Sequence, residues 1–278
     1  ESMEIFPVSG YAGLLDFLDS LQDQPIKIFA TAPAMVSISS ASRGVPRKTI
    51  RKILARKDVL GLGETYWQSL LQDPEYLLTS FDETLAVRKK LEGHSAGAGE
   101  NKLAAYVASG ISSCHEPINA KEVTDRLRLG LFVMIREGSI RRDLETISKI
   151  KDTGVSLRRL ALVTDGVTPK DLIERGYMEY VVQKAIDCGF DPVTAVQMAT
   201  LNVAEHFSID NIVGGIAPGR YADMLILPGP RIIRPDCVIS KGKIVAEKGK
   251  LLISPRKHNF SEESRNSVNL PRKLKASD

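Results

Sequence analysis

The chain has 278 residues, of which 43% are hydrophobic and 26% charged, a composition typical of a globular protein with a large buried core. Its net charge is only +4, and much of the basic excess lies in residues 255–278. We therefore expect no nucleic-acid partner. Residues 255–278 lack apolar periodicity, and we interpret them as a polar tail or linker. No apolar run approaches the roughly 18 residues of a membrane span and no signal pattern opens the chain, so we expect no membrane partner.

The cysteines also exclude some classes of protein. Cys114, Cys188 and Cys237 are odd in number, widely spaced and without a CxxC pair. We therefore expect neither a disulfide framework nor a structural zinc site. A reducing cytoplasm is the predicted location.

From Pro25 onward, short β-rich runs alternate with longer amphipathic stretches. The predicted strands are 26–31, 58–64, 89–94, 109–116, 131–139 and 160–166. The predicted helices between them are 46–57, 81–90, 101–109, 119–130 and 141–151, in which apolar residues recur at spacings of three and four. This alternation indicates repeated βα units around a parallel sheet.

The pattern changes after Asp165. Residues 169–189 and 191–207 are interpreted as two helices, and residues 214–229 and 237–252 as short strands with glycine turns. We place a boundary near Gly214. The predicted regions are therefore 1–213, built of βα units, 214–254, a small β segment, and 255–278, the tail or linker.

Each predicted strand ends on polar or ionisable residues, namely Thr31, Glu64, His94, His115 and Glu116, Arg136 and Glu137, and Thr164 and Asp165. In a β/α barrel the active site lies at the carboxyl ends of the strands, so residues far apart in sequence converge at one mouth. The glycines after His94 let the following loop turn away from that mouth. We therefore expect His94 to project into an active site.

Four of these strand-end residues are candidate metal ligands. Glu64, His94, His115 and Asp165 have the ligand types that hard or borderline divalent metals prefer. A metal held this way lowers the pKa of a bound water and supplies hydroxide near neutral pH. Glu116, next to a predicted ligand, is a candidate proton shuttle.

Glu122, at the start of the following predicted helix, is an equally good candidate for the shuttle. Structural roles compete with these assignments. A histidine at a strand end often serves as a hydrogen-bonded structural residue, Asp165 is also placed to cap the turn before Pro169, and Glu64 is also compatible with a surface position.

The run "MIREGS" (134–139) ends another strand. Arg136 and Glu137 either pair with each other or, together with Ser139, face a substrate. Cys114 precedes His115, but neighbours in a strand point to opposite faces. We therefore do not expect a Cys–His nucleophilic pair.

Several motifs, in the same order, resemble the adenine deaminases of the amidohydrolase superfamily. They are "GLGE" (61–64), "EGH" (92–94), "AYVASGISSCHE" (105–116), "LRLGLFVMIREGS" (127–139) and "AVQMATLNVAEHF" (195–207). The run "IAPGRYADMLIL" (216–227) is similar to the place where such chains leave the barrel for a small β-sandwich. The resemblance spans about 4–252. It implies an α/β fold, a TIM-like (β/α)8 barrel of metal-dependent hydrolases that is incomplete at the N-terminus, plus part of the β-sandwich.

The resemblance implies an enzyme of purine metabolism that converts adenine and water to hypoxanthine and ammonia. Matched residue by residue, Glu64 corresponds to a bridging metal ligand, His94 and His115 to further ligands, and Asp165 to the carboxylate that holds or deprotonates water. Glu116 or Glu122 would protonate the ring nitrogen and help the amine depart. The implied cofactor is divalent manganese, iron or zinc.

The chain departs from the family pattern around the mouth. The family has Asp-His-Glu where this chain has Cys114-His115-Glu116, and Thr-Asp-Asp where it has Thr164-Asp165-Gly166; the family's Pro-Ser-Cys-Val-Pro is here "PAMVSIS" (33–39). Relative to the family pattern, this chain lacks two carboxylates, whereas the residues matched to metal ligands are present. An amidohydrolase paralogue acting on another cyclic amidine or amide is therefore an alternative.

The superfamily carries a His-x-His pair on its first strand, and these residues contain none. Only about six strands are counted where a closed barrel has eight. We expect the first two strands, and half of the β-sandwich, to come from sequence outside these residues or from another chain, and unpaired strand edges favour a homo-oligomer. A non-catalytic barrel descendant is a third hypothesis. Family members also continue into a further C-terminal domain.

Overall fold

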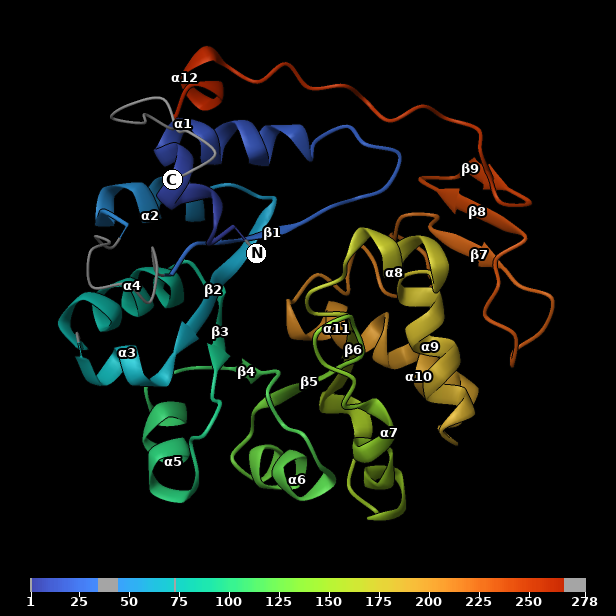
Figure 1. The fold of residues 1–278 in the computed structure, drawn as a ribbon, viewed down its shortest axis with the longest axis horizontal. Helices are drawn as coiled ribbons and strands as arrows, with labels where there is room; N and C mark the ends of the chain where they lie inside the picture. Colours follow the sequence, from blue (N-terminus) through green and yellow to red (C-terminus); the bar gives the residue numbers. More distant parts are fainter. Residues whose placement is uncertain (1, 35–44, 73, 268–278) are drawn as a thin grey trace, which may run out of the picture. The chain divides into compact units, whose positions relative to one another are not determined.

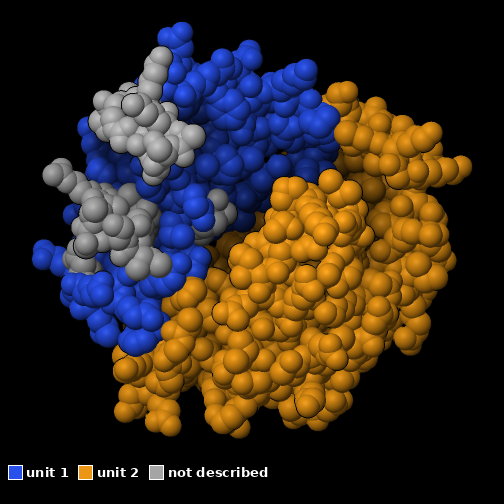
Figure 2. All heavy atoms as spheres, viewed as in Figure 1, with its two compact units in different colours: residues 1–91, 255–278 blue, residues 92–254 orange. Residues whose placement is uncertain are grey.

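The computed structural model of the chain describes residues 2–34, 45–72 and 74–267. Two compact units make up the chain: unit 1 contains residues 1–91 and 255–278, and unit 2 contains residues 92–254 (Figure 2). The departure from the family pattern at 35–39 lies outside the described residues. The described part has no helix that is both long and apolar enough to cross a membrane.

Unit 1 contains the first two strands and the start of the third. Strands β1 (Ala30–Ala32) and β2 (Val59–Tyr66) are parallel, and the sheet order is β1-β2-β3. Strand β3 (Lys90–His94) begins in unit 1 and ends in unit 2. The helices of unit 1 are α1 (Ile5–Ser20), α2 (Arg47–Leu54), α3 (Trp67–Gln72), α4 (Pro74–Ala86) and α12 (Glu262–Arg265). Helix α2 buries Ile50, Ile53 and Leu54, one stripe of an amphipathic helix.

The described part of the predicted tail contacts α1. The Asp16 carboxylate accepts hydrogen bonds from Ser261 N (3.0 Å) and Ser261 Oγ (2.6 Å), and Arg256 Nε donates to Gln22 O (2.9 Å). Because these contacts are polar, an apolar periodicity does not reveal them. The predicted boundaries at 214 and 255 remain predictions.

Unit 2 is built around a parallel sheet. Strands β4 (Ser113–Cys114), β5 (Phe132–Arg136) and β6 (Leu160–Val163) pair in that order. Val133, Ile135 and Leu160 are fully buried, as expected for parallel strands covered on both faces. In Figure 1, α6 and α7 pack against β5, and α9, α10 and α11 against β6. The helices are α5 (Glu100–Ala108), α6 (Ala120–Arg128), α7 (Leu144–Ile147), α8 (Pro169–Glu174), α9 (Met178–Asp187), α10 (Pro192–Met198) and α11 (Leu201–His206), with 3₁₀ turns at Ser148–Asp152 and Leu157–Arg159.

Unit 2 ends in a small antiparallel sheet. Its strands are β7 (Met224–Ile226), β8 (Cys237–Ser240), β9 (Lys243–Glu247) and β10 (Lys250–Leu251), in the order β10-β9-β8-β7. Leu225, Ile226 and Ile244 on this sheet are about half exposed. Its strands lie within 214–229 and 237–252, which the sequence predicts as short strands with glycine turns.

All six predicted strands of the βα region are present. In the described part of the chain they form two three-stranded sheets and no closed barrel, as the strand count predicts. The α/β prediction is therefore confirmed.

The prediction of single helices over 169–189 and 191–207 is wrong. Gly176 adopts a left-handed φ of 101° between α8 and α9, and Thr200 leaves helical geometry between α10 and α11, with φ −137° and ψ −85°. The predicted helix 81–90 instead belongs to α4, which begins at Pro74 and ends at Ala86. Helix α1 was not predicted.

Lys89 gives a test of the packing in unit 1. Its Nζ donates to the main-chain carbonyls of Leu54 (2.6 Å), Arg56 (2.6 Å) and Val59 (2.5 Å). Lys89→Met leaves three acceptors without this donor and is expected to lower the free energy of unfolding by about 2 kcal/mol in urea denaturation. The exposed Lys57, changed to methionine, is expected to have an effect within about 0.5 kcal/mol. Equal effects of the two substitutions would contradict this assignment.

Candidate metal centre

Two histidines and one carboxylate meet at the ends of β3 and β4. His94 is the last residue of β3, and His115 and Glu116 directly follow β4. Their ligand atoms lie within 4.8 Å of one another. Glu116 Oε1 is 3.0 Å from His115 Nδ1 and 3.3 Å from His94 Nδ1, and the two rings are edge to face with centroids 5.4 Å apart. Both imidazoles are thus turned toward the same carboxylate oxygen.

Gly93 allows this close approach. A Cβ added at Gly93 would lie 2.6 Å from Ser113 O and 2.8 Å from Tyr106 Oη, so β3 comes this close to β4 only because residue 93 has no side chain. Tyr106 Oη also accepts a hydrogen bond from His94 N at 3.0 Å. The glycine in the "EGH" motif therefore positions the histidine after it.

Glu116 is buried, with 7% of its surface exposed. Its Oε2 accepts hydrogen bonds from Ser95 N (2.7 Å) and Ser95 Oγ (3.1 Å), whereas Oε1 is buried without a hydrogen bond of good geometry. Burial alone would raise the pKa of this carboxyl, but contact with His115, the charge of His94 and the Ser95 N–H together hold its pKa at about 2. The side chain is therefore a carboxylate at neutral pH.

These three residues suit a divalent cation. Two imidazoles and an ionised carboxylate are the ligands that zinc, manganese and iron accept. The buried Oε1 of Glu116 still has acceptor capacity that no hydrogen bond uses. The donor set therefore fits a metal site.

Asp165 is not among the residues whose ligand atoms lie within 4.8 Å of one another. It follows β6 with a left-handed φ of 57°, and its carboxylate is 3.5 Å from Arg136 Nη1. Arg136 is buried and also binds Asp143 at 2.9 Å. Within unit 2, the structure thus brings together His94, His115 and Glu116 but not Asp165. Glu64, on β2, belongs to unit 1.

The other residues predicted to face a substrate at the end of β5 bind other groups of the protein. Glu137 is buried and its Oε1 forms an ion pair with Lys184 at 2.7 Å, while its Oε2 is buried without a hydrogen bond. Ser139 Oγ accepts from Thr168 N at 2.8 Å. Arg136 and Glu137 therefore bind different partners rather than each other, as expected for neighbours that point to opposite sides of a strand.

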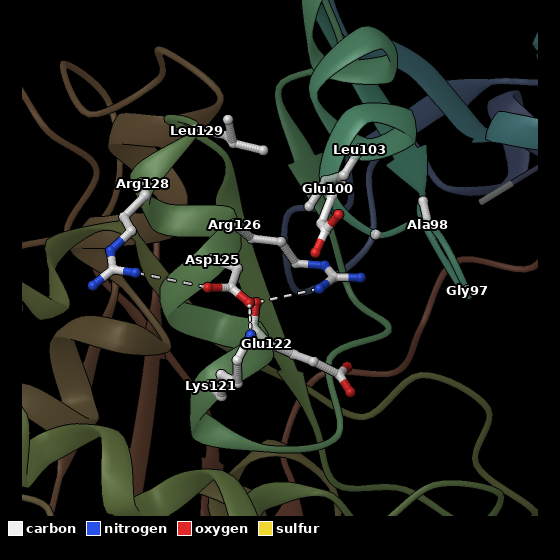
Figure 3. Close-up of a pocket in the computed structure, with 11 residues that line it drawn as sticks. Gly97, Ala98, Glu100, Leu103, Lys121, Glu122, Asp125, Arg126, Arg128 and Leu129 are labelled. Atoms are coloured by element: carbon white, nitrogen blue, oxygen red, sulfur yellow. Dashed lines mark hydrogen bonds and ion pairs between the residues drawn. The ribbon is translucent and has the colours of Figure 1, made fainter.

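Glu122 forms part of a helix cap. Asn119 Oδ1 accepts from Glu122 N (3.0 Å), and Glu122 Oε2 accepts from Ile118 N (3.2 Å). This arrangement at the start of α6 resembles a capping box. The side chain lines a groove of about 710 Å³ between α5 and α6 (Figure 3), and it is not part of the His94–His115–Glu116 group.

Cys114 is fully buried beside His115. Burial and the nearby Glu116 charge raise the pKa of its thiol to about 12. The thiol is therefore protonated at neutral pH and is not a nucleophile. All three cysteines have free thiols, which agrees with the expected absence of a disulfide framework.

Two polar groups near the site were not anticipated from sequence. Glu92, two residues before His94 on the same face of β3, binds His206 Nε2 at 2.8 Å and accepts from Ser113 Oγ at 2.7 Å. His206 stacks on Phe132. Glu92 and His94 are two residues apart, which places both side chains on the same face of a strand. This spacing was the sequence signal that could have identified Glu92. The second group is Ser95 and Arg126, which are joined by hydrogen bonds behind Glu116.

The sequence pattern of the amidohydrolase family matches residues 8–245. The chain belongs to the amidohydrolase family. It is 35% identical over 283 residues to the adenine deaminase of Cenarchaeum symbiosum, covering 100% of this chain and 46% of that protein. It is also 35% identical over 278 residues to the adenine deaminase of Moorella thermoacetica, covering 98% of this chain and 47% of that protein. This amidohydrolase chain thus spans about half the length of the curated relatives it matches.

Solved structures support the fold of this amidohydrolase. A β-aspartyl dipeptidase of Fervidobacterium islandicum has a TM-score of 0.61 at 14% identity, covering 90% of this chain and 71% of that one. An N-acetyl-D-glucosamine-6-phosphate deacetylase of Mycobacterium smegmatis has a TM-score of 0.62 at 17% identity, covering 86% and 71%. These likenesses show the fold alone.

Gly93 gives a test of the site's construction. Gly93→Ala places a methyl group against backbone and side-chain atoms of β4 and α5 and is expected to lower the free energy of unfolding by about 1–3 kcal/mol. A Cβ added at Gly229 would have nothing within 4 Å, and Gly229 has no left-handed φ, so Gly229→Ala is the matched control with a change within about 0.5 kcal/mol. Urea denaturation measures both. A Gly93→Ala chain as stable as the control would contradict the tight β3–β4 approach.

Proposed function

We propose that this protein is a metal-dependent aminohydrolase that converts adenine and water to hypoxanthine and ammonia. The observation that carries the proposal is the convergence of His94, His115 and the buried Glu116 carboxylate at strand ends. The adenine deaminases that are 35% identical to this chain support the choice of substrate.

His94 and His115 are the proposed ligands of a divalent manganese, iron or zinc ion. Glu64 is proposed as a further ligand because it lies on β2, the sheet neighbour of the strand that ends at His94. Such a cation lowers the pKa of water and supplies hydroxide near neutral pH. The imidazoles hold the cation at the mouth, where a heterocyclic substrate approaches the strand ends.

Asp165 is proposed to complete the ligand set and to hold or deprotonate the attacking water. The ion pair with Arg136 at 3.5 Å holds its carboxyl group in place. Proton delivery to the purine ring nitrogen is assigned to Glu116 or Glu122. Glu116 is the one of these two that lies against His94 and His115, whereas Glu122 is engaged in the α6 cap.

Arg136, Glu137 and Ser139 are proposed to form the substrate side of the mouth. The ion pair between Glu137 and Lys184 supports a role for Glu137 in holding the β5 loop in place. We further propose a cytoplasmic homo-oligomer whose partner is a purine or related heterocycle and not a nucleic acid.

His115 tests the metal role. His115→Ala removes an imidazole ligand and is expected to lower metal content and to reduce ammonia release from adenine by more than about 100-fold. The measurements are elemental analysis and ammonia release. His258, which lies 3.3 Å from Asp16 in unit 1, provides the matched control His258→Ala, with metal content and activity unchanged. An active, metal-replete His115→Ala protein would overturn the proposal.

Gly166 tests the second candidate, an amidohydrolase of another cyclic amidine or amide. The adenine-type pattern has a carboxylate here, and a Cβ at Gly166 would meet only the flexible end of Ile140, at 2.9 Å. Gly166→Asp is expected to leave metal content unchanged and to raise the rate with adenine relative to other heterocycles by about tenfold, roughly 1.4 kcal/mol. Ammonia release from a panel of purines measures this. If Gly166→Asp leaves the substrate preference unchanged and adenine is a poor substrate, the result would favour an amidohydrolase that acts on another cyclic amidine or amide.

A further inference from the structure

Glu116 is held from behind by a chain of donors that begins at a buried arginine. Ser95 is fully buried and donates to Glu116 Oε2 through its main-chain N (2.7 Å) and its Oγ (3.1 Å). Arg126, on α6, donates from Nε to the same Ser95 Oγ at 3.1 Å and from Nη2 to Ser95 O at 3.3 Å. One hydroxyl group therefore separates the guanidinium from the carboxylate.

The direction of these hydrogen bonds is fixed by chemistry. A guanidinium group has donors and no acceptor, so Ser95 Oγ must accept from Arg126. The single hydroxyl proton of Ser95 is then directed to Glu116 Oε2, because an ionised carboxylate only accepts. Each bond polarises the next in the same sense, from cation to anion.

Arg126 is unusual for a residue on a surface helix because only 4% of its surface is exposed. Its hydrogen bonds go to Ser95 Oγ, Ser95 O and Glu122 O, all oxygens of uncharged groups. A buried charge with neutral partners is costly unless an opposite charge is near. Glu116, one hydroxyl group beyond Arg126, carries an opposite charge.

The neighbouring Arg128 behaves differently. Figure 3 shows Arg126 reaching from α6 toward α5, with Arg128 on the opposite side of the helix. The Arg128 side chain is 76% exposed and lies 3.8 Å from Asp125. The same helix thus carries one arginine directed to the interior and one in solvent, which provides a matched control.

We propose that Ser95 and Arg126 are positioning residues of the candidate metal centre, which hold Glu116 so that its Oε1 faces His94 and His115. In this proposal neither residue binds substrate or cation directly. The proposal rests on the proposed metal-dependent function, because the group that they orient is part of that site. Outer residues of this kind commonly change metal affinity 10- to 100-fold when they are removed.

The first test needs no metal and uses thermal unfolding of the metal-free chain. Arg126→Met is expected to lower Tm by roughly 5–10 °C, because it removes the buried cation whose hydrogen bonds orient Ser95 behind the buried carboxylate. In a Glu116→Gln background the same substitution is expected to lower Tm by less than half as much. Arg126→Lys is expected to recover part of the loss, and Arg128→Met to change Tm by less than about 2 °C.

The second test titrates the metal-free chain with Zn²⁺ in competition with a coloured chelator. Ser95→Ala, a small change that keeps the main-chain donor, is expected to weaken Zn²⁺ binding about tenfold. In the Glu116→Gln background, Ser95→Ala is expected to cause no further loss, because Ser95 acts through Glu116.

The two tests separate the two proposals. Additive Tm shifts for Arg126 and Glu116, or equal Zn²⁺ losses for Ser95→Ala in both backgrounds, would overturn the positioning role. Coupled Tm shifts in a chain that does not bind Zn²⁺ would support the positioning of Glu116 and overturn the proposed metal-dependent function instead.

Discussion

The buried carboxylate of Glu116 is the group on which the candidate site depends. An ionised carboxylate in a protein interior costs several kcal/mol unless hydrogen bonds and opposite charges offset that cost. Here Ser95 supplies two hydrogen bonds to one oxygen, and the two imidazoles lie against the other. The low pKa of Glu116 follows from this arrangement. The carboxylate thus carries fixed negative charge beside the two histidines proposed as metal ligands.

The fold brings these groups together through backbone geometry rather than through local sequence. Strands β4, β5 and β6 are parallel, so the residues that follow them lie at the same edge of the sheet. Gly93 lets the end of β3 approach Ser113 closely. The loops after β5 and β6 are joined by hydrogen bonds from Glu137 N to Val163 O (2.9 Å) and from Ser139 N to Gly166 O (2.9 Å). Asp165 is held beside Arg136 in this way.

Sequence reasoning located the strand ends well because alternating βα units and polar strand termini leave a strong pattern. His94 and His115 were predicted as neighbours on that basis, and the structure places them together. The helix breaks at Gly176 and Thr200 were missed because apolar periodicity continues across them. Arg126 was missed for a different reason: its partner Ser95 is 31 residues away, and a pattern of spacing does not show which buried polar groups meet. The sequence signal that could have identified Arg126 is its position on the buried face of an amphipathic helix.

The central claim is that His94 and His115 hold a divalent cation. The most direct measurement is anomalous X-ray diffraction from crystals of this chain grown with Zn²⁺ or Mn²⁺, recorded on both sides of the metal absorption edge. The account predicts an anomalous peak at about 2.0–2.3 Å from a nitrogen of each imidazole, with the Glu116 carboxylate still bonded to Ser95. A metal peak elsewhere, with His94 and His115 bound only to protein groups, would contradict the account.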